Sequence, residues 1–122
     1  MSNLVDYQLM SVLGQVFIPS IMRSNSNFKE KAEGPDHVQV SMAVDDEHKC
    51  LIVKYEGRTT NNDHKAEYSG IDEFGRFVIR IKFRKLLDIS LDSTESLVLQ
   101  LIDENTMEIR KLAHTIYTDT TQ

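Results

Sequence analysis

Five basic side chains are concentrated in residues 75–85, a segment of the 122-residue chain that contains no acidic residue. They are Arg76, Arg80, Lys82, Arg84 and Lys85, whereas the chain as a whole carries a net charge of −5. Arginine and lysine bind phosphate groups, and the planar fork of arginine can make two hydrogen bonds to one phosphate. The cluster therefore indicates a surface for the phosphates of a nucleic acid.

The segment reads as a strand followed by a short helix. Because side chains alternate along a strand, we expect Arg76, Val78 and Arg80 to point outward and Phe77 and Ile79 to point into the core. On the helix, we expect the cations to lie opposite an apolar side. The cations are Lys82, Arg84 and Lys85, and the apolar side consists of Phe83, Leu86 and Leu87. An alternative stays open: acidic residues flank the segment and can pair with it, which would leave an ordinary solvated surface. They are Asp72, Glu73, Asp88 and Asp92.

Other chemistry is not indicated by the sequence. The four histidines show no paired metal-ligand spacing, and "DDEH" at 45–48 falls where a hairpin turn is expected. Cys50 lies in an alternating segment without the surroundings of a nucleophile, and as the single cysteine it cannot form an internal disulfide. We find no glycine-rich phosphate loop and no catalytic Ser/His/Asp pattern. We therefore expect no catalytic site, no metal site and no cofactor.

The chain shows internal similarity at an offset of 61 residues. Residues 7–23, "YQLMSVLGQVFIPSIMR", run parallel to residues 68–84, "YSGIDEFGRFVIRIKFR", so that Gly14 matches Gly75 and Arg23 matches Arg84. Residues 38–55 and 96–112 also correspond, each reading as strand, acidic turn, strand. Each copy then predicts strand, glycine turn, strand, short helix and a final hairpin. The helix is clear at 81–87, but the first copy has few helix-forming residues after Arg23.

The second copy resembles the SpoVT-AbrB family of swapped-hairpin DNA-binding domains. The family pattern is an apolar residue, Asp, one residue, an apolar residue, Gly-Arg, three apolar residues, then Pro and a helix with arginines. The second copy matches it through Ile71, Asp72, Phe74, Gly75, Arg76, Phe77, Val78, Ile79, Arg84, Lys85, Leu87 and Ile89. The first copy matches through Leu13, Gly14, Val16, Phe17, Ile18, Pro19, Ile21 and Arg23. The first copy has Gln15 where the family has Arg, and the second has Arg80 where the family has Pro.

The resemblance implies the fold and the domain organisation. It predicts a β-rich α+β protein in which two tandem swapped-hairpin repeats form one small pseudo-dimeric β-barrel with short helices, similar to the tandem MraZ proteins. The expected divisions are a degenerate first repeat at 1–55, a linker at 56–66, a second repeat at 67–113 and a tail at 114–122. A repeat of this size has too little surface to bury on its own, so two repeats packing together is also the physically favoured solution.

The same resemblance implies a DNA-binding transcriptional regulator that contacts double-stranded DNA. The expected contacts are Arg76, Arg80, Lys82, Arg84 and Lys85, with Arg23 as a lesser contributor. Because the first copy offers few cations, pairing with a second copy or with a related regulator is a further hypothesis. The alternative is a protein-interaction module on the same fold, either antitoxin-like or acting as a partner or antagonist of a related DNA-binding regulator. No signal-peptide pattern and no apolar stretch of about 20 residues is found, so a cytoplasmic protein without membrane contact is expected.

Overall fold

The computed structural model describes residues 4–31, 37–59 and 67–112. The first half of the chain contains β1 (Leu4–Met10), β2 (Gln15–Phe17), α1 (Ser20–Ser24), the 3₁₀ helix η1 (Asn27–Lys29), β3 (His37–Asp45) and β4 (Cys50–Thr59). The second half contains β5 (Tyr68–Ile71), β6 (Arg76–Val78), α2 (Ile81–Leu86), β7 (Glu95–Asp103) and β8 (Thr106–Lys111). The predicted order of strands, turns and helices is therefore confirmed for the described residues.

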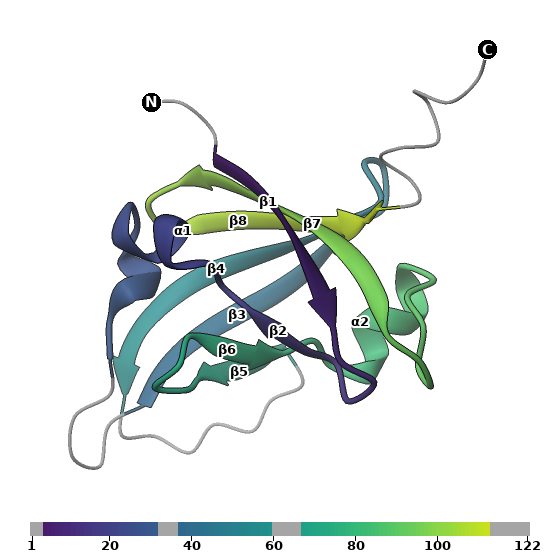
Figure 1. Cartoon of the computed structure of the whole chain (residues 1–122), viewed down its shortest axis with the longest axis horizontal. Helices are drawn as coiled ribbons and strands as arrows, with labels where there is room; N and C mark the ends of the chain where they lie inside the picture. Colours follow the sequence, from purple (N-terminus) through teal and green to yellow (C-terminus); the bar gives the residue numbers. More distant parts are fainter. Residues whose placement is uncertain (1–3, 32–36, 60–66, 113–122) are drawn as a thin grey trace.

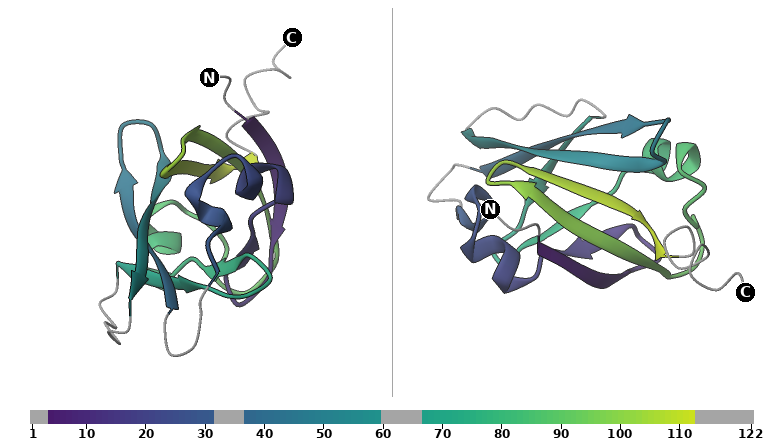
Figure 2. Two further views of the ribbon diagram at one scale, coloured as in Figure 1. Left: turned by 90° about the vertical axis from the view of Figure 1, so that its left-hand side faces the viewer. Right: turned by 90° about the horizontal axis from the view of Figure 1, so that it is seen from above.

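The strands form a six-stranded antiparallel sheet and a separate two-stranded ribbon (Figure 1). The order in the large sheet is β1-β7-β8-β4-β3-β5, and the ribbon pairs β2 with β6. The two short helices, α1 and α2, lie at opposite ends of the molecule (Figures 1 and 2). The protein is thus a small β-rich α+β domain.

The closed barrel expected from the sequence is not found among the described residues. The large sheet ends at β1 on one side and at β5 on the other, and neither strand is hydrogen-bonded to the other. The ribbon of β2 and β6, three residues each, forms a separate sheet and, among these residues, is hydrogen-bonded in a ladder to neither edge. Both of these strands stop shortly before a helix begins, at Ser20 and Ile81.

The strand pairing is unchanged when the first four strands are exchanged with the last four. Thus β1 pairs with β7 and β5 with β3, while β2 pairs with β6 and β4 with β8. The register of the ribbon has the same property, because Gln15 faces Val78 and Phe17 faces Arg76. Each half therefore contributes neighbours to the strands of the other half, and the two halves share one sheet.

The core lies between the curved sheet and the ribbon (Figure 2). Alternate strand residues supply it, as in β3, where Val38, Val40 and Met42 are buried between partly exposed neighbours. The ribbon contributes Val16 and Phe77, both almost fully buried. Burial of this apolar surface is the main stabilising contribution, at roughly 25 cal/mol for each Å² removed from water.

One strand boundary and one short helix differ from the sequence prediction. β4 continues to Thr59, so the first residues of the expected linker at 56–66 belong to a strand; residues 60–66 and the expected tail at 114–122 lie outside the described residues. After Arg23 the chain continues into η1, where Ser26 Oγ accepts a hydrogen bond from the Phe28 N–H and Phe28 is buried. Tertiary burial of Phe28 thus stabilises a helical segment of low intrinsic propensity.

Within the described ranges, none of the helices has both the length and the apolar character that a membrane span requires.

Candidate nucleic-acid interface

Two tight turns of matching geometry precede β2 and β6 and position the basic segment. In the first, the Gly14 N–H donates to the Ser11 carbonyl and the Ser11 N–H to the Gln15 carbonyl. In the second, Gly75 donates to Asp72 and Asp72 donates to the Arg76 carbonyl in the same way. Gly14 and Gly75 have φ values of +87° and +83°, a backbone region that favours glycine.

Each turn is joined to the other half of the chain. The Ile79 N–H donates to the Gly14 carbonyl and the Ile18 N–H to the Gly75 carbonyl, both at 2.8 Å. A helix arginine also crosses each glycine from the opposite half. A Cβ atom on Gly14 would lie 3.1 Å from Arg84 Cζ, and one on Gly75 would lie 2.7 Å from Arg23 Nε. The absence of a side chain at each glycine is what admits the arginine.

Arg84 is therefore a buried residue, with a relative exposure of 4%. Its Nη1 donates to the Val12 carbonyl at 3.2 Å and to the Ser90 carbonyl at 3.3 Å. The sequence prediction had placed it on the exposed side of the helix. It lies instead on the buried side with Phe83 and Leu87, while Leu86 is 57% exposed. Residues three and four apart share a helix face, so Arg84 and Leu87 turn inward together.

Arg23 has an equivalent position with more exposure. Its Nε donates to the Ile18 carbonyl at 2.9 Å, and its guanidinium carbon lies 5.2 Å from the centre of the Phe17 ring. The side chain is half-buried. Arg23 packs against the Gly75 turn of the other half, as Arg84 does against the Gly14 turn, but its hydrogen bond stays within its own half.

Arg76 forms an ion pair within its own turn. Arg76 Nε lies 2.7 Å from Asp72 Oδ2, and the guanidinium stacks near the Phe74 ring at 4.9 Å. Partial burial raises the pKa of Asp72, but hydrogen bonds from the Arg76 backbone and side chain and from the Phe74 N–H outweigh it, so that the pKa is lowered. The flanking acid therefore neutralises Arg76 in part, as the alternative reading of the cluster proposed.

Arg80, Lys82 and Lys85 are the exposed cations of the segment. Arg80 donates through Nε and Nη2 to the Tyr68 carbonyl, which fixes its direction and leaves its other N–H donors available. Lys82 Nζ lies 5.3 Å from the centre of the Phe83 ring, and Lys85 follows it on the exposed face of α2. Within the described part of the chain, none of the three forms an ion pair with an acidic residue.

A groove of about 420 Å³ lies beside these cations. Its apolar lining includes Leu13, Val78 and Ile81, and Arg80 and Lys82 also line it. Leu13 is 76% exposed although it is a large apolar residue. The outward direction of Val78 and Arg80, and the burial of Phe77 and Ile79, agree with the alternation predicted from the sequence.

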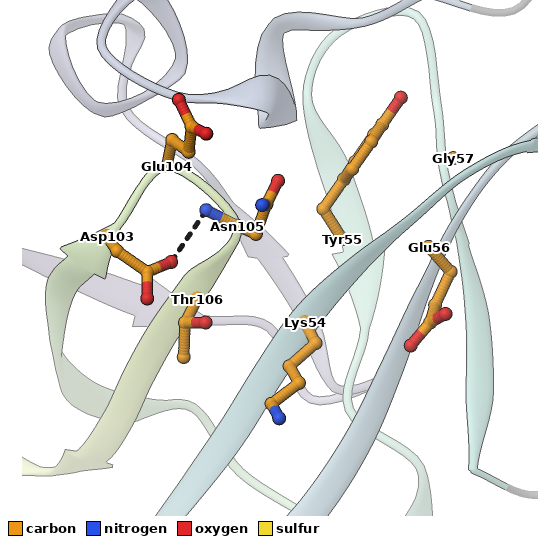
Figure 3. A pocket seen from close by; sticks show the side chains of 8 residues that line it. All are labelled: Lys54, Tyr55, Glu56, Gly57, Asp103, Glu104, Asn105 and Thr106. Carbon is orange, nitrogen blue, oxygen red and sulfur yellow. Dashed lines mark hydrogen bonds between the residues drawn. The ribbon is translucent and has the colours of Figure 1, made fainter.

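A second cavity lies elsewhere, at the β7–β8 turn, and its lining has the opposite charge. It measures about 770 Å³ and is lined by Lys54, Tyr55, Glu56, Gly57, Asp103, Glu104, Asn105 and Thr106 (Figure 3). The Asp103 carboxylate accepts a hydrogen bond from the Asn105 N–H at 2.8 Å, which stabilises the turn. Three carboxylates against one lysine make this surface unsuitable for phosphate.

No metal-binding group of three or more His, Cys, Asp or Glu side chains occurs in residues 4–31, 37–59 and 67–112. The "DDEH" segment is the β3–β4 turn, as expected: the Asp45 carboxylate accepts from the Glu47 and His48 N–H groups. The ring of the exposed His48 also donates a hydrogen bond from Nδ1 to the Asp45 carboxylate, which raises the pKa of His48. Cys50 is fully buried, and burial raises the pKa of its thiol.

The sequence did not predict that Arg84 packs against Gly14 and Arg23 against Gly75. The signal for these contacts was present in the 61-residue offset, which relates Gly14 to Gly75 and Arg23 to Arg84. The offset was interpreted as an internal duplication with Arg84 as a main and Arg23 as a lesser DNA contact, and the internal contact of each arginine with a glycine turn was not predicted.

No protein-family model matches the chain. A search of curated proteins finds no match either.

Proposed function

We propose that the protein is a DNA-binding transcriptional regulator of the AbrB-like type, acting in the cytoplasm on double-stranded DNA. The observation that carries the proposal is the set of exposed cations on and beside α2, Arg80, Lys82 and Lys85, in a chain of net charge −5. A local field depends on how charges cluster, so an acidic protein can present a phosphate-binding face.

In this proposal Lys82 and Lys85 contact phosphates as point charges, and Arg80 contacts a phosphate or a base edge through its free N–H donors. Arg76 lies at the border of the face and exchanges its ion pair with Asp72 for a phosphate. Arg84 and Arg23 support the face from inside, by holding the turns at Gly14 and Gly75.

The proposed class also includes the tandem swapped-hairpin arrangement, with repeats at 1–55 and 67–113. The exchange symmetry of the strand pairing supports it, since β1 and β5 each pair with the third strand of the other half. The two helices support it as well, because each places an arginine on the glycine turn of the other half.

The experiment compares two double variants that each remove two positive charges. Lys82→Gln/Lys85→Gln alters the proposed face, and Lys49→Gln/Lys54→Gln alters exposed lysines in and next to β4. Gel shift with mixed-sequence duplex DNA at several salt concentrations measures both. Losing two phosphate contacts is expected to weaken binding about tenfold or more and to lower the salt slope by roughly 1.8.

The control variant is expected to bind like the wild type, since it changes the net charge equally but not the face. Equal weakening in both double variants would show that only net charge matters and would overturn the assignment of the face. Absence of binding by the wild-type protein at low salt would overturn the function itself.

A second candidate function is a protein-interaction module, favoured by the groove beside α2. Exposed Leu13, Val78 and Ile81 next to Arg80 and Lys82 would suit an acidic, amphipathic segment of a partner protein. Chromatography on heparin separates the candidates, because the polyanion mimics DNA. Retention that is lost in Lys82→Gln/Lys85→Gln favours DNA, and lack of retention favours the protein partner.

A further inference from the structure

β1 is an edge strand with an apolar outer row. Its one hydrogen-bonded neighbour in the described residues is β7. Val5, Tyr7 and Leu9 point outward and are 52%, 57% and 62% exposed. Large apolar side chains in a row on an unpaired edge are usually avoided in single-chain proteins, because such an edge can pair with another strand.

The other edge strand of the sheet, β5, is shorter and has fewer apolar residues facing outward. β5 has four residues against seven in β1, and it contains Gly70 at an exposed position. β1 contains neither lysine nor proline, and its register with β7 has no bulge. Short length, charge, proline and bulges are the features that protect edge strands. Of these features β1 has only the charge of Asp6, so it is the edge suited to pairing.

A backbone donor at the centre of β1 is bonded to a side chain of the same strand. The Tyr7 N–H donates to Asp6 Oδ1 at 2.7 Å. In the interior of a sheet, strand N–H groups donate to carbonyls of neighbouring strands. The carboxylate here takes the place of such a carbonyl.

We propose that β1 pairs with β1 of a second copy of this chain, antiparallel and about a two-fold axis at Tyr7. Tyr7 is the middle residue of Leu4–Met10, so this register overlaps the whole strand. It sets Val5 opposite Leu9 of the second copy, which are both apolar. It sets Asp6 opposite Gln8 of the second copy, so no like charges meet. A register centred on Asp6 would bring two carboxylates together, which is unfavourable.

The contact joins two six-stranded sheets edge to edge into one sheet. A strand of seven residues is about 24 Å long. Pairing along a single strand of this length buries less surface than the 1,200–2,000 Å² typical of stable complexes. The dimer is therefore a weak one, with an expected dissociation constant of roughly 10–100 μM. Each copy carries −5, so added salt screens the repulsion and tightens the dimer, whereas it weakens DNA binding. This inference does not depend on the proposed function.

Sedimentation equilibrium of the full chain from about 1 to 500 μM tests the proposal. The wild type is expected to shift from monomer to dimer, and Tyr7→Lys is expected to remain monomeric. Ile21→Lys is the matched control, because Ile21 is 54% exposed and lies on α1. It is expected to dimerise as the wild type does. A monomeric wild type throughout, or an equal effect of Ile21→Lys, would overturn the proposal.

Single cysteines test the register independently of affinity. Tyr7→Cys would lie opposite itself across the axis, at the Cα separation of about 4.5–5.5 Å that a disulfide accepts. Leu9→Cys alone would lie opposite Val5 and has no partner thiol. Mild oxidation is expected to cross-link Tyr7→Cys and not Leu9→Cys, while Val5→Cys/Leu9→Cys cross-links again. The native Cys50 is fully buried and serves as the internal control. Faster cross-linking of Leu9→Cys than of Tyr7→Cys would exclude this register.

Discussion

The surroundings of α1 and α2 match in backbone and differ in surface. Both helices follow an extended residue, Pro19 with φ −58° and ψ 148° and Arg80 with φ −66° and ψ 151°. Both place an arginine, Arg23 or Arg84, over the glycine turn of the other half. The exposed side of α2, however, carries Lys82 and Lys85, whereas the exposed residues of α1 are Ser20, Ile21 and Ser24.

The comparison separates two kinds of arginine and lysine in a basic segment. Those present at matching positions of both halves, Arg23 and Arg84, serve the internal contact between the halves. Of those present in one half only, Arg80, Lys82 and Lys85 face solvent, and Arg76 is half-buried and paired with Asp72. The contact between the halves uses matching positions of both, whereas the proposed binding face uses positions of one half. The proposed binding face therefore depends on the difference between the halves and not on their similarity.

The largest expected effect distinguishes the two glycines. Gly14→Ala would bring Cβ within 2.7 Å of the Ile79 carbonyl oxygen, a backbone atom, at a φ of +87°. Gly75→Ala would meet the Arg23 side chain, which can rotate away, at a φ of +83°. We expect Gly14→Ala to lower the free energy of unfolding by about 3 kcal/mol or more and Gly75→Ala by about 1–2 kcal/mol.

Urea unfolding at neutral pH measures both glycine variants. Gly70→Ala is the control: the nearest atom to its Cβ would be the Val38 carbonyl oxygen at an ordinary 3.8 Å. A larger loss of stability in Gly75→Ala than in Gly14→Ala would contradict the expectation that the backbone contact at Gly14 is the more costly of the two.

Replacement of the two arginines is expected to have the next largest effect. Arg84→Ala leaves the Val12 and Ser90 carbonyls without a donor and opens a cavity in a buried site, at a cost of about 2–3 kcal/mol. Arg23→Ala removes one bond to the Ile18 carbonyl from a half-buried site and is expected to cost about 1 kcal/mol. Equilibrium unfolding of the two variants tests this order.

DNA binding by the same variants sharpens the comparison further. At temperatures where both are folded, Arg23→Ala and Arg84→Ala are expected to keep the salt slope of the wild type, because neither residue is proposed to contact phosphate. A reduced salt slope of DNA binding in folded Arg84→Ala would show that Arg84 contacts phosphate after all.

The sequence predicted the order of elements because that order depends on local patterns. Alternation in β3, the glycine turns and the Asp-rich hairpin turns are all read from neighbouring residues, and each appears where expected. The end of β4 at Thr59 was missed because the polar residues 56–59 resemble a linker, although they continue the pairing of β4 with β3. The burial of Phe28 was missed because it depends on a distant contact, with Tyr55 in β4. Closure of the sheet was likewise beyond local patterns, because it depends on whether its edge strands β1 and β5, far apart in the sequence, are joined.

The candidate site was predicted in part for a related reason. Strand alternation has a period of two residues and correctly gave the outward direction of Arg80 and the burial of Phe77. On a helix of only six residues, placing the centre of the apolar face one residue away from its true position assigns some residues to the wrong face. Here it put Leu86 inside and Arg84 outside. Arg84 was assigned outward because it is charged. The space above Gly14, which accommodates its guanidinium, comes from the other half of the chain.

The smallest expected effect concerns the acid that only the second turn has. Asp72 accepts from the Arg76 N–H at 2.9 Å, where the first turn uses the Ser11 hydroxyl to accept from the Gln15 N–H at 3.1 Å. Hydrogen bonds from Arg76 and Phe74 outweigh the effect of partial burial, and the pKa of Asp72 is lowered. Its contribution to stability is then present above the unfolded value of 3.8 and is lost as the pH falls through the folded value.

Asp72→Ser would give the second turn the chemistry of the first. We expect a loss of less than about 1 kcal/mol at pH 7, because the Asp72–Arg76 pair is partly exposed and screened by solvent. The difference from the wild type should shrink as the pH falls below about 4. Urea unfolding between pH 7 and pH 2.5 measures it, with exposed Asp46→Ser as a control for the loss of one carboxylate. A difference that stayed constant over this range would mean that the ionised form of Asp72 contributes nothing to stability beyond what its neutral form does.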